Sequence, residues 1–246
     1  MSTIFDLGMH RGLDTRFYLD KGFRVVALEA NPALVAEARG AFAPEIADGR
    51  LAIEDRALWS DEAGTIAFWV NSEKDDWSSA IRGWAEKGGH AAHCVEVATV
   101  TLGRLFDRHG VPYYAKCDIE GADEVFVRQL HDDPRRPAFV SVEAASADLF
   151  AYLRAAGYDR FQIVNQAFLP FAAIPDPARE GVRVEARFNG HMSGLFGREL
   201  EPARWKGFRD ALDDFLAFER LRHRDPLLAH GWIDVHATTH AALADG

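Results

Sequence analysis

The chain has 246 residues, a formal net charge of −10 at pH 7 and two cysteines, and 48% of its residues are hydrophobic. Its length suits one large α/β domain, and no apolar run is long enough to cross a bilayer. The acidic balance disfavours nucleic acid and anionic membranes as partners. Two cysteines cannot build a disulfide framework, and the first residues lack the pattern of a signal peptide. We therefore expect a soluble, cytoplasmic protein that acts on a small molecule or a sugar.

The first part of the chain alternates between short apolar strands and helices. Strands are expected at residues 3–5, 23–28 and 50–55, and helices at 13–21 and 31–42. Asn31 followed by proline is typical of a helix start, because the side chain caps the first turn and proline fits its first position. This β-α-β-α-β order predicts a parallel sheet with helices on both faces.

Residues 60–100 depart from this rhythm. Two stretches, 65–70 and 94–100, alternate in polarity as half-exposed strands do. Between them, residues 71–89 are polar and contain tryptophan, with one helical turn expected near 80–87. We interpret the region as a β insertion beside the main sheet, with its polar loop near the ligand site.

The rest of the chain completes the sheet. Four more strands are expected at 113–117, 138–142, 160–164 and 232–237, and helices at 101–109, 122–130, 147–156 and 202–222. We predict a single domain over residues 1–246. Within it, residues 1–165 form the cofactor-binding core, with the insertion at about 60–100, and residues 166–246 form a C-terminal cover and the last strand.

The helix expected at 202–222 carries an apolar stripe of Trp205, Phe208, Leu212, Phe215 and Leu216. Apolar residues at this spacing form one face of a helix. We interpret the stripe as core rather than as a dimer surface, and the oligomeric state stays open, with a homodimer as the alternative.

Acidic residues stand at the carboxyl ends of five expected strands, namely Asp6, Glu29, Asp55, Asp118 with Glu120, and Glu143. Ligands bind outside the carboxyl ends of an open parallel sheet. A ring of carboxylates there is costly unless it serves cations, hydroxyls or amines. S-adenosylmethionine brings a sulfonium, an ammonium and a ribose diol, all of which suit carboxylates.

The glycine turn after the first strand separates two cofactor classes. A dinucleotide loop needs Gly-x-Gly-x-x-Gly, and here Met9 and His10 stand where the second glycine would be. The pyrophosphate of a dinucleotide would also be repelled by the carboxylates. An NAD(P)-dependent oxidoreductase is therefore the first alternative, and a non-catalytic nucleoside-binding module is the second.

Several stretches resemble the FkbM family of class I S-adenosylmethionine-dependent methyltransferases. They are Asp-Leu-Gly-Met-His-Arg-Gly (6–12), Glu-Ala-Asn-Pro (29–32), Arg-Ala-Leu-Trp-Ser-Asp (56–61), Ser78-Ser79, Lys-Cys-Asp-Ile-Glu-Gly-Ala-Asp (116–123) and, later, Gly-His-Met-Ser-Gly-Leu-Phe-Gly (190–197). The sequence departs from the family pattern at His10, which replaces an asparagine, and at Leu195, which replaces a proline.

The resemblance implies a Rossmann-like class I methyltransferase fold. It consists of a mostly parallel seven-stranded sheet flanked by helices, a β insertion and a C-terminal helical and loop extension. It also implies transfer of a methyl group to a hydroxyl oxygen of a natural product or a sugar, with S-adenosylmethionine as cofactor.

The resemblance further implies roles for individual residues on the cofactor side. The methionine part is expected against Asp6, Gly8, Met9, His10 and Gly12, with Asp118 near the sulfonium and the ammonium. Thr15 is expected either to bond the carboxylate or to lie on the helix surface. The ribose is expected at Glu29, beside Ala30 and Asn31. The adenine is expected at Asp55, Arg56 and Ala57.

Methylation of an alcohol requires a base within hydrogen-bond reach of its proton. The candidate bases are Glu120, His10 and His191, with Glu143 behind them. Trp77, Ser78, Ser79 and Glu143 are expected on the substrate side. No dedicated metal ligands are expected, although the clustered carboxylates offer Mg²⁺ an alternative position beside a diol.

Overall fold

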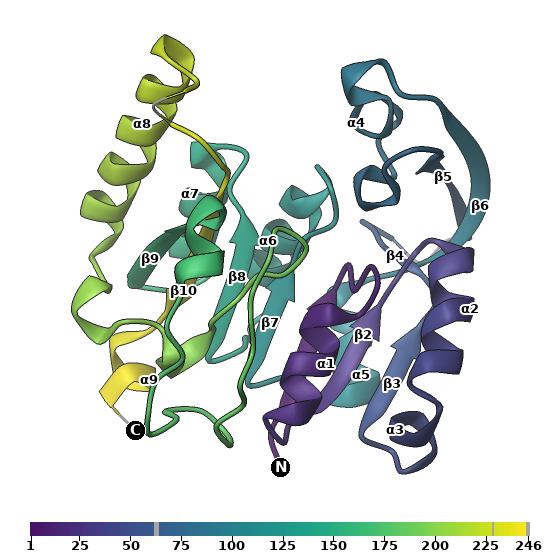
Figure 1. The fold of residues 1–246 in the computed structure, drawn as a ribbon, viewed down its shortest axis with the longest axis horizontal. Helices are drawn as coiled ribbons and strands as arrows, with labels where there is room; N and C mark the ends of the chain where they lie inside the picture. The colour runs from purple at the N-terminus through teal and green to yellow at the C-terminus, as the bar shows by residue number, and fades with distance from the viewer. Residues whose placement is uncertain (62–63, 228, 245–246) are drawn as a thin grey trace.

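A seven-stranded sheet forms the centre of the computed structural model, which describes residues 1–61, 64–227 and 229–244 (Figure 1). The strand order is β3-β2-β1-β7-β8-β10-β9. The strands are β1 Thr3–Leu7, β2 Arg24–Leu28, β3 Leu51–Glu54, β7 Tyr114–Cys117, β8 Phe139–Glu143, β9 Arg160–Asn165 and β10 Ile233–Thr238. The seven strands that the sequence predicts are thus confirmed.

One strand of the sheet runs against the others. β10, the last strand of the chain, lies antiparallel between β8 and β9, whereas the five strands from β3 to β8 pair in parallel. The dinucleotide-binding arrangement, in contrast, has the order 3-2-1-4-5-6 with six strands. Because β10 is reversed, its first residues lie at the same edge of the sheet as the last residues of the parallel strands.

Helices and loops cover both faces of the sheet. One face packs against α5 Leu102–His109, α6 Asp123–Asp132, α7 Ala147–Ala155 and α8 Phe208–Arg224. The other face packs against α1 Leu13–Asp20, α2 Pro32–Ala41, the segment 166–200 and α9 His240–Ala244. Short helices α3 Ala43–Ala47, η3 Gln166–Phe171 and η4 Gly197–Glu199 complete these layers. None of the described helices combines the length and apolar character needed to span a membrane.

The insertion forms a small second sheet of β4 Ala57–Leu58, β5 Thr65–Asn71 and β6 Ala92–Val100 (upper right in Figure 1). β5 and β6 are antiparallel, as the alternating pattern predicts. β4, which is too short to show a pattern, pairs in parallel with β6. The loop between β5 and β6 contains η1 Asp75–Trp77, α4 Arg82–Ala85 and η2 Lys87–Gly89.

The helix predicted at 202–222 is interrupted. η5 Pro202–Arg204 is followed by an extended segment, in which the backbone of Lys206 exchanges two hydrogen bonds of 2.8 Å with Phe161. α8 therefore begins only at Phe208. Trp205 does not belong to the stripe and instead packs beside Phe139, with 6.2 Å between ring centroids. The rest of the stripe faces the core, where Phe215 is 2% exposed.

A buried ion pair joins the C-terminal segment 166–200 to α1. Lys21 follows α1, and its Nζ lies 2.5 Å from Oε1 of Glu199, with both side chains fully buried. The same ammonium donates to the carbonyl of Val182 at 3.1 Å. A charge in such a position needs its partner, because removing one member leaves the other charge buried without compensation.

We predict that Lys21→Met lowers the free energy of unfolding by about 3–5 kcal/mol, the typical loss when one member of a buried pair is removed. The matched control is Arg39→Met, which removes an exposed pair with Asp55 and should cost less than about 1 kcal/mol. Urea unfolding followed by circular dichroism measures both. Equal losses in the two variants would contradict a buried anchor.

Candidate active site

A cavity of about 440 Å³ lies at the carboxyl edge of the sheet. This volume is within the usual range for small-molecule sites. Among the described residues, its wall includes the turn after β1, the ends of β2, β7 and β8, the insertion residues 74–78 and the segment 190–193. The insertion loop and the C-terminal segment therefore both face this cavity, as the sequence predicts.

The turn after β1 brings backbone to backbone at the bottom of the cavity. Gly8 has φ +84°, and a Cβ at this position would lie 1.9 Å from the carbonyl oxygen of Asp118. Only glycine avoids that clash. The N–H groups of Gly8 and Met9 donate to the carbonyl of Leu28 at 2.9 and 3.0 Å. His10 then takes the left-handed conformation, with φ +50°.

Glu29 is held rigidly at the end of β2. One carboxylate oxygen accepts from the backbone N–H of His10 and the other from that of Asn31, both at 2.8 Å. The side chain is 7% exposed and lines the cavity. Burial raises the pKa of this carboxyl to about 7. The backbone N–H donors lower the pKa, but their effect is smaller than that of burial. Its fixed oxygens can accept hydrogen bonds from two neighbouring hydroxyls.

Lys116 of β7 holds the turn after β1 in place through its buried ammonium group. Its Nζ donates to the carbonyl of Gly8 at 2.7 Å and lies 3.2 Å from Oδ1 of Asp6 and 4.0 Å from Oδ2 of Asp14. Burial opposes the ammonium charge, but the surrounding carboxylates outweigh it and raise the pKa of Lys116 well above its usual value. Asp6 also accepts from the Thr15 hydroxyl at 2.6 Å. This cluster holds the site together.

One part of the cavity is apolar. Leu28, Leu34, Ala57, Leu58 and Phe68 line it together with Ala30. These residues come from β2, α2 and the insertion, and they lie on the side of Glu29. A flat heterocycle attached to a ribose would find an apolar surface here, next to a carboxylate.

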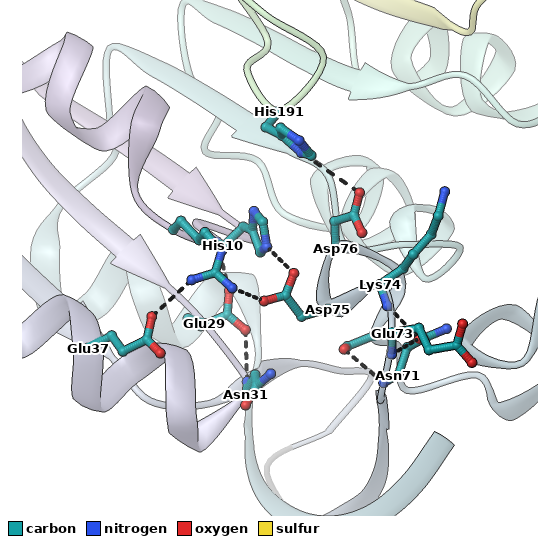
Figure 2. A network of polar contacts seen from close by, with 12 residues as sticks. His10, Glu29, Asn31, Glu37, Asn71, Glu73, Lys74, Asp75, Asp76 and His191 are labelled. Carbon is teal, nitrogen blue, oxygen red and sulfur yellow. Dashed lines mark hydrogen bonds and ion pairs between the residues drawn. The ribbon is translucent and has the colours of Figure 1, made fainter. Parts of the chain in front are cut away.

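The insertion closes the mouth of the cavity through a polar network (Figure 2). Nε2 of His10 lies 3.0 Å from Oδ1 of Asp75, which also pairs with Arg11. On the other side, Nδ1 of His191 lies 3.8 Å from Asp76. Burial favours the neutral form of Asp75, but His10 and Arg11 outweigh it and lower the pKa. The network bridges the β1 turn and the insertion.

Three carboxylates gather where β7 and β8 end. Oxygen atoms of Asp118, Glu120 and Glu143 all lie within 4.8 Å of one another. Glu120 accepts from Nε1 of Trp84 at 2.6 Å and from Nζ of Lys87 at 3.0 Å. Its backbone is left-handed, with φ +52°, a conformation that is unfavourable for a residue with a side chain. The insertion therefore holds this carboxylate in place.

Both glutamates of this cluster have raised pKa values. Burial, followed by the charge of Asp118, raises the pKa of Glu120 to about 7, while Lys87 lowers it. The same two causes raise the pKa of Glu143 to about 10. Glu120 can thus ionise near neutral pH, whereas Glu143 holds its proton.

Several expected site residues face the cavity and others do not. Those that line it are Gly8, Met9, His10, Glu29, Ala30, Ala57, Trp77, Ser78, Asp118, Glu120, Glu143 and His191. Those that support its wall from behind are Asp6, Gly12, Thr15, Asn31 and Ser79. Thr15, for example, is fully buried and donates to Asp6, so the expectation that it reaches a cofactor carboxylate is wrong.

Gly12 and Ser79 have packing roles instead. A Cβ on Gly12 would lie 2.7 Å from the ring of Phe42, which explains a glycine there without a ligand. The Ser79 hydroxyl donates to the carbonyl of Glu120 at 2.7 Å and so ties the insertion to the turn after β7.

Of the three residues expected to border the adenine, Ala57 lines the cavity, whereas Asp55 and Arg56 are not part of its wall. The Asp55 carboxylate is 54% exposed and lies 2.9 Å from Arg39. Arg56 lies 3.7 Å from Glu54. The reason is that β3 ends at Glu54, so the following residues turn outward before Ala57 reaches the wall.

Sequence reasoning missed other residues that line the cavity. They are Asp14, Lys74, Asp75, Asp76, Lys87, Lys116, Gln166, Trp232 and Asp234. Lys116 stands in a stretch that resembles the family, and that resemblance was the signal that could have found it. Asp234 is at the beginning of a reversed strand, so a search of strand carboxyl ends passes over it.

The strand order and this site define a Rossmann-like class I methyltransferase fold. A family model described as a methyltransferase FkbM domain matches residues 6–160. The chain therefore belongs to the FkbM methyltransferase family, for which S-adenosylmethionine is the usual cofactor. A comparison with curated proteins finds no match.

Two solved structures illustrate how distant the structural similarities are. Precorrin-6y C5,15-methyltransferase from Geobacter metallireducens GS-15 is 10% identical, with 97% of this chain and 79% of that chain covered and a TM-score of 0.42. A methyltransferase FkbM from Methylobacillus flagellatus KT is 16% identical, with 67% of this chain and 39% of that chain covered and a TM-score of 0.39. This chain thus spans well under half of the latter protein.

We predict that the ligand-free protein loses stability as the pH rises from about 4.5 to 8. The pKa values of Asp14, Glu29 and Asp123 are raised to about 7, chiefly by burial. In this window the folded protein keeps protons that the unfolded chain has released, so a rising pH favours unfolding. Asp75, with its lowered pKa, acts only below the window. Burial lowers the pKa of His236 to about 3, so this group opposes the effect up to about pH 6.5, but the three carboxyls outnumber it.

Differential scanning calorimetry at constant ionic strength measures this effect. The expected result is a lower Tm at pH 8 than at pH 5.5. A Tm that stays level or rises over this range would show that the buried carboxyls are ionised in the folded protein.

Proposed function

We propose that this protein transfers a methyl group from S-adenosylmethionine to a hydroxyl of a small molecule or a sugar. The observation that carries the proposal is the position of Glu120. Its carboxylate is held by Trp84 and Lys87 at the strand edge, in the same cavity as the Gly8 turn and Glu29.

The residues present fit this cofactor. The Gly8 turn lines the cavity, and its glycine allows the close approach to the backbone carbonyl of Asp118 that brings the ends of β1 and β7 together there. Glu29 offers fixed hydrogen-bond acceptors for the ribose diol. The apolar surface that includes Leu34 and Phe68 suits the adenine ring. Asp118 supplies a carboxylate for a positive charge. When bound, the cofactor supplies an electrophilic methyl group on a positively charged sulfur.

The chain's own contribution is alignment, exclusion of water and removal of one proton. An alcohol acceptor must lose its hydroxyl proton as the new carbon–oxygen bond forms, and Glu120 is placed to take it. A pKa of about 7 keeps much of this carboxyl ionised at neutral pH, while burial preserves its basicity. Glu143, with a pKa of about 10, is protonated and is the weaker base.

The two histidines are less suited to this role. Both histidines lie at the mouth of the cavity beside the insertion, where His10 pairs with Asp75 and His191 lies beside Asp76. His191 is 56% exposed, so water would compete for its ring nitrogens. We assign them to the closure of the mouth.

We predict that Asp118→Asn and Glu120→Gln separate binding from catalysis. Asp118→Asn should weaken binding of S-adenosylhomocysteine at least tenfold, since its charge serves the ammonium group, which this product keeps. Glu120→Gln should spare binding and lower turnover by about 10²–10⁴-fold, the usual contribution of a general base. Calorimetry measures binding, and transfer of labelled methyl to a panel of sugars, polyols and phenols measures turnover.

The control is Glu124→Gln, which makes the same change on the exposed face of α6, where Glu124 pairs with Arg128. It should leave both quantities unchanged. Equal loss of binding in the Asp118 and Glu120 variants would overturn the base assignment. Cofactor binding without turnover on any panel member would favour a non-catalytic binding module.

A further inference from the structure

The far side of the cavity, at the ends of β8 and β10, carries two carboxylates without partners. Glu143 and Asp234 lie directly opposite each other in the antiparallel pair, so their side chains share one face of the sheet. Both line the cavity, and Asp234 is 6% exposed. No described residue forms a hydrogen bond or an ion pair with either carboxylate. Two negative charges placed in this way would destabilise the strand pair.

A buried amide lies beside them. Gln166 begins η3 directly after β9, is 2% exposed and lines the cavity. Among the described residues, neither its amide nitrogen nor its amide oxygen has a hydrogen-bond partner. Its backbone N–H donates to the carbonyl of Trp232, which places the glutamine next to the start of β10. A polar side chain buried in this way is costly unless a ligand supplies the missing bonds.

Other carboxylates of the cavity already have donors or cations. Glu29 accepts from two backbone N–H groups, Asp14 from Ser193, Asp75 from His10 and Arg11, and Glu120 from Trp84 and Lys87. Asp118 and Asp234 both lie in the field of Lys116, and no described residue forms a hydrogen bond with the carboxylate of Asp118. The acceptors left without donors include Asp118, which the proposed function assigns to the cofactor, and the group of Glu143, Asp234 and Gln166.

We propose that Glu143, Asp234 and the amide oxygen of Gln166 form a subsite for a protonated primary amine on the methyl acceptor. An ammonium has three donors and one positive charge, which match three acceptors, two of them carboxylates. This inference rests on the proposed function, because it describes the acceptor of the same reaction. Trp232, 39% exposed, adds an apolar wall for the carbon skeleton.

The distance between Glu120 and Glu143 limits the chemical class of the methyl acceptor further. Oxygen atoms of Glu120 and Glu143 lie within 4.8 Å of each other. If Glu120 takes the proton of the hydroxyl while Glu143 holds the ammonium, the two groups must lie close together on the acceptor. A 1,2- or 1,3-amino alcohol spans this distance, and both are found in amino sugars and aminocyclitols.

A divalent cation fits the same region less well. The carboxylates that come close enough for a metal are Asp118, Glu120 and Glu143. Glu120 already binds an indole N–H and the Lys87 ammonium. A metal on this carboxylate would be pressed against Lys87, and it would leave Gln166 unsatisfied.

Binding of an ammonium should release protons. Burial, followed by the charge of Asp118, raises the pKa of both Glu143 and Asp234, so the free cavity holds protons there. The other charged groups that act on the pair are Asp14, Lys116, Glu120 and Asp123. A bound cation would displace a proton from the pair.

Calorimetry with the full chain saturated with S-adenosylhomocysteine tests the subsite. The probes are 2-amino-2-deoxy-D-glucose, 2-deoxystreptamine and 2-aminoethanol, each compared with its neutral N-acetyl or hydroxyl analogue, and Mg²⁺ alone. At least one amine should bind ten or more times more tightly than its neutral analogue. Titrations in buffers of different ionisation enthalpy should show proton release.

Two variants and one control complete the experiment. Glu143→Gln with Asp234→Asn should abolish the preference for the amine, whereas Glu124→Gln on the surface of α6 should retain it. The double variant should also raise the Tm of the ligand-free protein, because it removes facing carboxyls. A fall in that Tm would instead indicate a structural pair and overturn the proposal.

Equal binding of amines and neutral analogues, binding of no amine, or binding of Mg²⁺ alone would also overturn it. The saturation step keeps the two proposals apart. If S-adenosylhomocysteine binds but no amine does, only the subsite fails. If S-adenosylhomocysteine itself does not bind, the proposed function fails.

Discussion

The buried ammonium of Lys116 is the interaction on which the site depends. A charge with almost no contact with water must be compensated by neighbouring groups, and here Asp6, Asp14 and the carbonyl of Gly8 supply that compensation. These partners belong to β1, the glycine turn and α1. Asp14 in turn accepts from the backbone of Ser193, so the same cluster positions the C-terminal segment over the cavity.

The rest of the cavity is organised against this anchored turn. The insertion reaches it through Asp75 at the mouth and through the bonds of Trp84 and Lys87 to Glu120. Glu120 is held in a strained backbone conformation by these contacts, and such strain is often found at functional sites. Among the described residues, the carboxyl groups of Glu143 and Asp234 have no hydrogen-bond partner, and burial of such groups is unfavourable. A cationic cofactor and acceptor would compensate them.

The sequence was sufficient for the sheet, because hydrophobic runs, helix caps and glycines are local signals. It was also sufficient for Glu29 and Asp118, which end parallel strands and line the cavity. It failed where the outcome depends on neighbours distant in the chain. Thr15 turns to Asp6 rather than to a ligand, and Asp234 reaches the site only because β10 is reversed. Such details follow from tertiary packing, which no local pattern encodes.

The central claim is that an anchored glycine turn and a fixed Glu29 form a pocket for the adenosyl and amino-acid parts of S-adenosylmethionine, which S-adenosylhomocysteine shares. Titration of S-adenosylhomocysteine and, separately, NADH into the ligand-free protein tests this claim most directly. We predict saturable binding of S-adenosylhomocysteine to one site per chain and no binding of NADH. Binding of NADH without any response to S-adenosylhomocysteine would contradict the assignment of this cavity.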